Sequence, residues 1–291
     1  MRRCALLLLV LAACPKHSEQ KPVEPRVKHD AAPVIAADAA GSSAATLPPA
    51  PPLPEVPPGL PQPPPHDGVT PDAVAFGALL FADTSLSHTG KTACATCHDP
   101  AHGFSGRVDT ADSGTKEPLR TPALVNLAWV RGFGWDGKTS PLENFIAAHA
   151  GHELGLDVAP GGPLYAAYAA KLGGEHSWIT ALTAYVLTRY AGDSTWDRLE
   201  RAPSRPKDLD DGYKLFVGKA GCAHCHAPPL YTDASVHDGY RTPSMRGVAV
   251  RPALLHDGSA PDIAAAIDHH GPALRLSTAE KSALVAFVQA L

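Results

Sequence analysis

Two short motifs of this chain combine residue types that hold metal-centred cofactors. Residues 94–98 read Cys-Ala-Thr-Cys-His and residues 222–226 read Cys-Ala-His-Cys-His. The C-x-x-C-H pattern is typical of covalent haem c attachment, in which both thiols form thioethers with the porphyrin and the adjacent histidine coordinates the iron. The sequence therefore predicts two haem c groups. The attachment residues would be Cys94, Cys97, Cys222 and Cys225, and the proximal iron ligands would be His98 and His226.

The same four cysteines allow two other interpretations. They could form a four-cysteine zinc site, but such a site gives no reason for a histidine after each pair. They could also be redox-active or disulfide-bonded pairs, although no β-α-β pattern surrounds either motif. Because a histidine follows both pairs, haem attachment is the favoured interpretation.

Each haem motif lies inside a longer internal repeat. An Arg-Thr-Pro segment follows at 120–122 in the first copy and at 241–243 in the second. An Asp-Gly pair then follows at 136–137 and at 257–258, so the Arg-to-Asp spacing is 16 residues in both copies. A spacing conserved within one chain indicates duplication. We therefore expect two homologous haem domains.

The elements that must position these motifs are predicted to be helices. Apolar periodicity favours helices over 70–81, 178–190 and 210–217, and the segments 140–143 and 277–280 are typical of capping boxes. No run alternates apolar and polar residues for long enough to propose a sheet. The sequence thus predicts an all-α fold of two small bundles, in which each porphyrin completes a core.

The first 66 residues are not expected to belong to this fold. Arg2 and Arg3 precede a short apolar run, and Leu-Ala-Ala before Cys14 resembles the lipobox of bacterial lipoproteins. We expect a signal peptide over 1–13 and a lipid anchor on Cys14 that binds the protein to a membrane. An ordinary secretory signal is the alternative, and both imply export.

Residues 14–66 are expected to form a disordered tether. They hold 15 of the 30 prolines, and no aromatic residue precedes Phe76. Such a segment cannot bury enough apolar surface to offset the entropy of ordering. Only 19% of all residues are charged and the net charge is -4, so no basic surface for nucleic acid is expected.

Taken together, residues 67–291 resemble the bacterial dihaem cytochrome c peroxidase family, which includes the methylamine dehydrogenase maturation enzymes. This resemblance implies two cytochrome-c-like domains in tandem, a peroxidatic one over 67–205 and an electron-transfer one over 206–291. The segments that carry it are FGALLF (76–81), RTPALVN (120–126), WDGK (135–138), GKAGC (218–222), RTPSMR (241–246) and HDG (256–258).

The resemblance also implies an activity. H2O2 would be reduced to water with electrons from a small soluble donor, a cytochrome c or a cupredoxin, at the periplasmic face of a Gram-negative membrane. Trp135 would conduct electrons between the haems. Glu153 in the segment His-Glu-Leu-Gly would be the acid/base, with His149, one helical turn away, as the reserve candidate. A maturation-type oxidase acting on a protein or organic substrate and a non-enzymatic electron carrier are the alternatives, and a homodimer is left open.

Three departures from the family pattern shape further expectations. Relatives use Met or Tyr as the sixth ligand of the second haem iron, and here that position is His270, with His269 as the alternative. Met245 is not expected to be this ligand, because it occupies a core position of the repeat. The stretch 103–119 lacks the histidine that blocks the first haem in many relatives, which predicts an open iron face. Arg120 replaces the Asn that helps to bind Ca²⁺ in relatives, so Ca²⁺ is disfavoured as a further cofactor.

Overall fold

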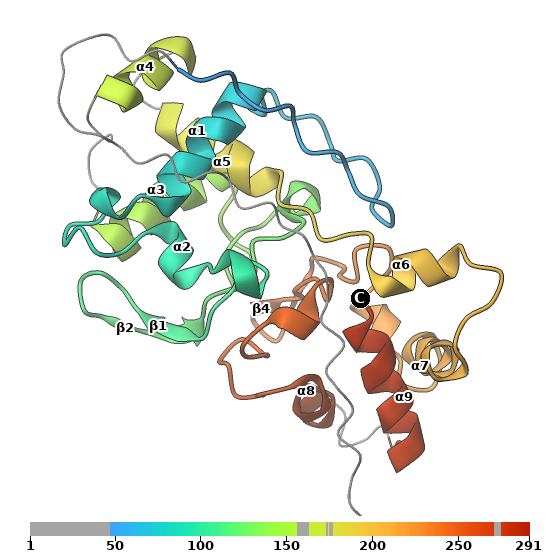
Figure 1. Ribbon diagram of the computed structural model, residues 1–291. Helices are drawn as coiled ribbons and strands as arrows, with labels where there is room; N and C mark the ends of the chain where they lie inside the picture. Colours follow the sequence, from blue (N-terminus) through green and yellow to red (C-terminus); the bar gives the residue numbers. More distant parts are fainter. Residues whose placement is uncertain (1–46, 156–162, 173, 175–176, 271–274) are drawn as a thin grey trace, which may run out of the picture. The chain divides into compact units, whose positions relative to one another are not determined.

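Two closely crossing helices form the centre of the first half of the folded chain. α1 (Pro71–Ala82) is capped at its N-terminus by Thr70, whose hydroxyl accepts a hydrogen bond of 3.2 Å from the Ala73 amide. α1 packs against α5 (Ser177–Leu187), which is buried over most of its length (Figure 1). A Cβ at Gly77 would lie 2.0 Å from the Ala181 carbonyl oxygen. Glycine at this position therefore allows the two backbones to touch.

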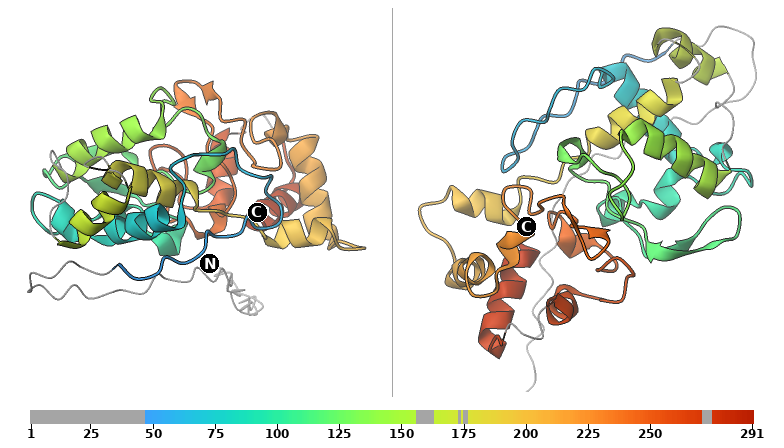
Figure 2. Two further views of the ribbon diagram at one scale, coloured as in Figure 1. Left: turned by 90° about the horizontal axis from the view of Figure 1, so that it is seen from above. Right: turned by 180° about the vertical axis from the view of Figure 1, so that it is seen from behind.

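The second half repeats this arrangement. α7 (Lys207–Val217) packs against α9 (Thr278–Gln289), and the two helices lie side by side in Figures 1 and 2. A Cβ at Gly212 would lie 2.1 Å from the Ala283 carbonyl oxygen, as at Gly77 in the first half. The capping box at Ser277 is confirmed, since its hydroxyl accepts from the Glu280 amide and the Glu280 carboxylate from the Ser277 amide.

Several further elements also occur in matching order in the two halves. α3 begins at Leu142 and α8 at Ile263, an offset of 121 residues, and a short hairpin precedes each of them. The segment at 140–143 differs from expectation, because Pro141 rather than Ser140 is the N-cap and its side chain caps nothing. The other bounds are α2 (Cys94–Cys97), α3 (Leu142–Leu154), α4 (Pro163–Leu172), α6 (Thr195–Glu200), α8 (Ile263–His270), β1 (Val108–Thr110), β2 (Lys116–Arg120), β3 (Val236–His237), β4 (Tyr240–Arg241) and the 3₁₀ helices η1 (Thr84–Leu86), η2 (Pro100–His102), η3 (Leu127–Trp129), η4 (Cys222–His224) and η5 (Val248–Val250).

The fold is helix-rich but not strictly all-α. β1 pairs with β2 and β3 with β4 as antiparallel two-stranded ribbons, which the sequence patterns did not predict. The ribbons are too short for an alternating pattern to be visible in the sequence. Buried apolar side chains form two clusters, one from Ala73 to Leu187 and one from Trp196 to Leu291.

This computed structural model describes residues 47–155, 163–172, 174, 177–270 and 275–291. The predicted signal peptide, Cys14 and the tether up to residue 46 lie outside the described residues. Within the described ranges, no helix is both long and apolar enough to cross a membrane.

The expectation of a disordered tether is wrong for the stretch just before the first helix. Residues 57–62 contain no helix or strand, but their carbonyl groups accept hydrogen bonds from the folded chain. Pro58 accepts from the Asp193 amide at 2.6 Å, Gly59 from Arg246 Nη2 at 2.7 Å and Gln62 from Trp129 Nε1 at 3.3 Å. A proline-rich backbone leaves carbonyls that no secondary structure uses, and here tertiary donors satisfy them.

Candidate functional site

The first C-x-x-C-H motif presents its histidine in a fixed orientation. Cys94 and Cys97 lie on α2, and His98 directly after them is 6% exposed. The His98 Nδ1 lies 3.2 Å from the Phe104 carbonyl oxygen and 3.1 Å from that of Pro122. With Nδ1 against main-chain carbonyls, Nε2 is the nitrogen that can coordinate iron. Burial raises the pKa of the Cys94 thiol to about 12.

The second motif repeats this geometry. The His226 Nδ1 lies 3.1 Å from the Tyr231 carbonyl oxygen, which again assigns Nε2 to a metal. Burial lowers the pKa of His226, and this favours the neutral imidazole that ligates iron. His224 inside the motif is exposed. Both motifs therefore fit a covalently attached haem, because each histidine is oriented by the hydrogen bond typical of metal-bound imidazoles.

Helix α3 carries His149 and Glu153 toward the first motif. The ring centroids of His149 and His98 are 6.0 Å apart, with the ring planes inclined by 63°. The Glu153 Oε1 lies 3.9 Å from the His149 Nδ1, and the Glu153 side chain is 20% exposed. Burial, with contributions from the charges of His98 and His152, lowers the pKa of His149 to about 3. Glu153 thus lies beside an imidazole that faces the first haem motif.

Two further groups surround Glu153. The His152 Nε2 lies 3.8 Å from the Glu153 Oε1 and 3.4 Å from the Glu117 Oε1. These ligand-type atoms lie within 4.8 Å of one another, a spacing that would also suit a metal ion. Glu117 was not among the residues predicted from the sequence, because it comes from strand β2 and no motif marks it.

Trp135 connects the two halves of the repeat. Its Nε1 donates to the Arg120 carbonyl at 2.8 Å, and its own carbonyl accepts from the Arg241 amide at 2.6 Å. The equivalent bond of the other half runs from the Arg120 amide to the His256 carbonyl at 2.9 Å. A cavity of about 140 Å³ is lined by Trp135, Arg241 and Arg251, among others. The residue before each Asp-Gly pair thus accepts a hydrogen bond from the Arg-Thr-Pro segment of the other half.

Arg120 and Arg251 are buried in this region. The Arg120 Nε donates to the Leu255 carbonyl and Arg251 Nη2 to the carbonyls of Ser244 and Arg246. Burial lowers the pKa of Arg120 to about 10 and that of Arg251 to about 9, where the charge of Arg120 contributes as well. Both guanidinium groups therefore donate hydrogen bonds to main-chain carbonyl oxygens. A bound metal cation would be coordinated by oxygens of the same kind.

His270 is the last residue of α8. Its Nδ1 lies 2.9 Å from the Ala266 carbonyl oxygen. Burial is the main cause of the lowered pKa of His226, and the charge of His270 lowers that pKa further. The ring of His269 lies 6.0 Å from that of His270. Met245 is partly buried against the second apolar cluster, in agreement with its predicted core position.

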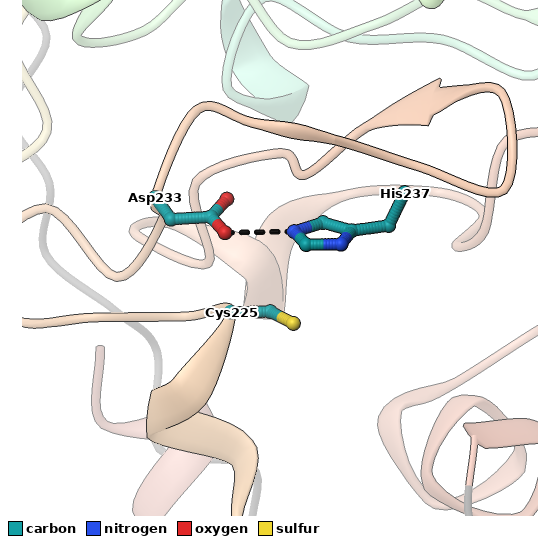
Figure 3. Close-up of side chains that lie close together, drawn as sticks. All are labelled: Cys225, Asp233 and His237. Atoms are coloured by element: carbon teal, nitrogen blue, oxygen red, sulfur yellow. Dashed lines mark hydrogen bonds and ion pairs between the residues drawn. The ribbon is translucent and has the colours of Figure 1, made fainter.

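A third group of side chains lies beside the second haem motif. His237 Nε2 and Asp233 Oδ2 are 2.8 Å apart, and Cys225 lies next to them (Figure 3). The three residues have the spacing of metal ligands. A thioether at Cys225 would occupy its sulfur, which could then not serve as a thiolate ligand. We therefore assign Asp233 and His237 to the surroundings of a haem attachment point.

Comparison with known proteins decides the family. The family model for di-haem cytochrome c peroxidase matches residues 71–159. The methylamine utilization protein MauG of Methylorubrum extorquens is 32% identical over 279 residues, which cover 77% of this chain and 79% of that protein. The chain belongs to the di-haem cytochrome c peroxidase family.

Some relatives of this protein are named MauG and others are named cytochrome-c peroxidase. The cytochrome-c peroxidase IdrP1 of Denitromonas iodatirespirans is 33% identical and covers 69% of this chain and 57% of its own length. Among solved structures, a MauG-like protein associated with microbial copper homeostasis superposes with a TM-score of 0.67 at 20% identity, covering 81% of this chain and 94% of that one.

The diheme peroxidase BthA from Burkholderia thailandensis gives a TM-score of 0.62 at 18% identity and covers 82% of this chain and 95% of its own. At these identities the superpositions establish the fold. Family membership makes the protein an oxidoreductase with two haem c groups, for which the two C-x-x-C-H motifs supply the attachment residues.

Proposed function

We propose that this protein is a dihaem c-type peroxidase that reduces H2O2 to water with electrons from a small periplasmic donor. The proposal rests on one observation: the Glu153 carboxylate lies 3.9 Å from His149, whose ring faces His98. A haem held by Cys94, Cys97 and His98 would supply the redox chemistry. One H2O2 takes up two electrons and two protons and leaves as two waters.

Glu153 provides the proton transfer that this reaction needs. Its carboxylate accepts the proton of one peroxide oxygen and returns it to the other, so that the second oxygen leaves as water. The Glu153 side chain is 20% exposed and lies beside His152. The protons that the reaction consumes would reach Glu153 from solvent through His152. Glu153 thus acts as acid and base in turn.

Trp135 is the proposed electron path between the domains 67–205 and 206–291. Its ring and main chain hydrogen-bond to Arg120 of the first half and Arg241 of the second. Electrons would enter at the haem held by Cys222, Cys225 and His226. Arg120 and Arg251 would take the place of the divalent cation that relatives hold between their domains.

The test is steady-state turnover of H2O2 by the purified dihaem protein with a reduced cytochrome c as donor. The proposal requires turnover that depends on both donor and peroxide. Oxidation of an added protein or organic substrate with no donor consumption would instead favour the maturation-type oxidase, the second candidate, which the MauG-named relatives support. No reaction with peroxide would leave an electron carrier. A lipid anchor on Cys14 belongs to the same proposal and predicts an acylated N-terminal cysteine in the mature protein.

His270 is the proposed sixth ligand of the second haem, with His269 as the alternative. Replacing His270 with Ala should convert one of the two ferric haems from low spin to high spin, because an electron-transfer iron would lose its axial imidazole. Electron paramagnetic resonance of the oxidised protein measures this. The matched control is His269→Ala, which should leave the spectrum unchanged. The reverse result would move the assignment to His269.

A further inference from the structure

Three metal-ligating side chains converge where helix α3 meets strand β2. The His152 Nε2 lies 3.4 Å from the Glu117 Oε1 and 3.8 Å from the Glu153 Oε1, and all three atoms lie within 4.8 Å of one another. A Zn²⁺ ion with bonds of about 2.0–2.2 Å to nitrogen and oxygen holds its tetrahedral ligands about 3.3–3.6 Å apart. The three side chains therefore stand close to the positions of ligands around one ion.

The burial of the Glu117 carboxylate requires compensation. Its Oε1 atom is buried and accepts no hydrogen bond from any residue that the structure describes. A buried carboxylate oxygen without a donor costs free energy, and a bound ion is one of the few features that account for it. The separation of 3.4 Å from the His152 Nε2 is longer than a hydrogen bond and fits two ligands of one metal.

Hydrogen bonds hold the elements that carry the three side chains. The Asp112 amide, in the turn between β1 and β2, donates to the Glu153 carbonyl at 2.8 Å. The His88 amide donates to the Leu154 carbonyl at 2.8 Å. The end of α3 is thereby fixed against the β1–β2 hairpin and the loop before the first haem motif. Ligands that are already positioned lose little conformational freedom on binding, which favours a site here.

The types of donor atom indicate which metal would bind. One imidazole nitrogen and two carboxylate oxygens suit Zn²⁺, whereas Mg²⁺ and Ca²⁺ prefer oxygen ligands alone. Three protein ligands leave the fourth tetrahedral position to water, as in open zinc sites. The His152 side chain is 59% exposed, so an ion can reach the group from solvent.

We propose that Glu117, His152 and Glu153 form a Zn²⁺ site whose occupation inhibits the protein. The inhibition rests on the role of Glu153 under the proposed function, because a carboxylate bound to Zn²⁺ cannot accept and return the proton of peroxide. The ion also occupies the His152 nitrogen, through which protons reach Glu153 from solvent. Bound Zn²⁺ therefore stops peroxide reduction, and removal of the ion restores it.

Isothermal titration calorimetry of the holoprotein with Zn²⁺ tests the site without any assay of turnover. The holoprotein is used because thioether bonds occupy the four cysteines, which would otherwise bind the ion. We expect one Zn²⁺ per chain. X-ray absorption at the zinc edge should show only nitrogen and oxygen neighbours at about 2.0–2.2 Å, whereas sulfur neighbours at about 2.3 Å would contradict the site.

Glu117→Gln should lower the affinity for Zn²⁺ by at least about 10-fold, since even the loss of an indirect partner of a metal ligand costs that much. Without Zn²⁺ this variant should reduce H2O2 at the wild-type rate. The matched control is Glu143→Gln, which removes a carboxylate of the same helix that lies 3.1 Å from a single imidazole, that of His66. It should bind Zn²⁺ like the wild type, and so should His237→Ala, which changes the group around Cys225.

Inhibition connects the site to turnover. Zn²⁺ should inhibit H2O2 reduction by the wild type, with half-inhibition near the dissociation constant from calorimetry, and a chelator should reverse this. Glu117→Gln should require at least about 10-fold more Zn²⁺ for the same inhibition. If this variant does not fold, His152→Ala supplies the same affinity readout.

A wild-type protein that binds no Zn²⁺, or whose affinity neither Glu117→Gln nor His152→Ala changes, would overturn the proposal. An active protein that binds Zn²⁺ at these residues and is not inhibited would overturn it as well. A protein that binds Zn²⁺ through these residues but never turns over peroxide would support the site and contradict the proposed function, so the two failures are distinguishable.

Discussion

Replacing Glu153 with Gln is expected to lower the steady-state rate of H2O2 reduction by about 10²- to 10⁴-fold, the usual contribution of a positioned acid/base. The amide keeps the size of the side chain but cannot accept and return a proton. The ferric spectrum and the haem content should remain those of the wild type, because Glu153 itself is not an iron ligand. Stopped-flow or steady-state assays with a reduced cytochrome donor measure the rate.

Glu143→Gln is the matched control for this experiment. Glu143 lies at the start of the same helix, and its carboxylate is 3.1 Å from His66 rather than near the haem motif. This variant should retain wild-type turnover. Equal rates for Glu153→Gln and the wild type would show that the acid/base lies elsewhere, with Glu117 as the next carboxylate to change.

Replacing Asp197 with Ala is expected to destabilise the folded protein by about 3–5 kcal/mol, the usual cost of leaving one partner of a buried ion pair uncompensated. The Asp197 carboxylate binds Arg246 at 2.7 Å, and both side chains are only 1% exposed. Arg246 also donates to the carbonyls of Gly59 and Pro229. Without Asp197, its charge would keep only carbonyl groups and the ring of Tyr231, whose centroid lies 5.3 Å from the Arg246 Cζ, as neighbours.

Urea unfolding followed by far-ultraviolet circular dichroism measures this loss. The control is Asp193→Ala, which removes the exposed partner of Arg198 and should leave the unfolding midpoint almost unchanged. A similar midpoint for Asp197→Ala and the wild type would contradict the prediction. Because Asp197 also accepts from the Ser194 amide, Asp197→Asn separates the loss of charge from the loss of the helix cap.

The same ion pair predicts a dependence on pH. Burial raises the pKa of Asp197, but its hydrogen bond and ion pair with Arg246 outweigh this and hold the pKa below its ordinary value. The stabilisation is therefore complete above the unfolded pKa of about 3.9 and is lost as pH falls from there through the folded value. Unfolding midpoints of wild type and Asp197→Ala should differ at pH 7 and converge in acid.

Some features followed from contiguous residues and were readable in the sequence. The C-x-x-C-H motifs are five consecutive residues, so the proposed haem attachment needed no knowledge of the fold. The helix start at Thr70 and the capping box at Ser277 depend on groups three residues apart, and both predictions are confirmed. The offset of the internal repeat, a property of the sequence alone, also pairs His149 with His270.

Other features depend on contacts between distant residues. The facing of His149 and His98 brings together residues 51 positions apart, and Glu117 approaches His152 from a short ribbon that no pattern announced. The docking of residues 57–62 depends on Arg246, a donor 187 residues away from Gly59. Local sequence specified which residues can hold haem, whereas only tertiary packing decided which side chains face that site. Those contacts join segments that are far apart along the chain, so no local pattern in the sequence predicts them.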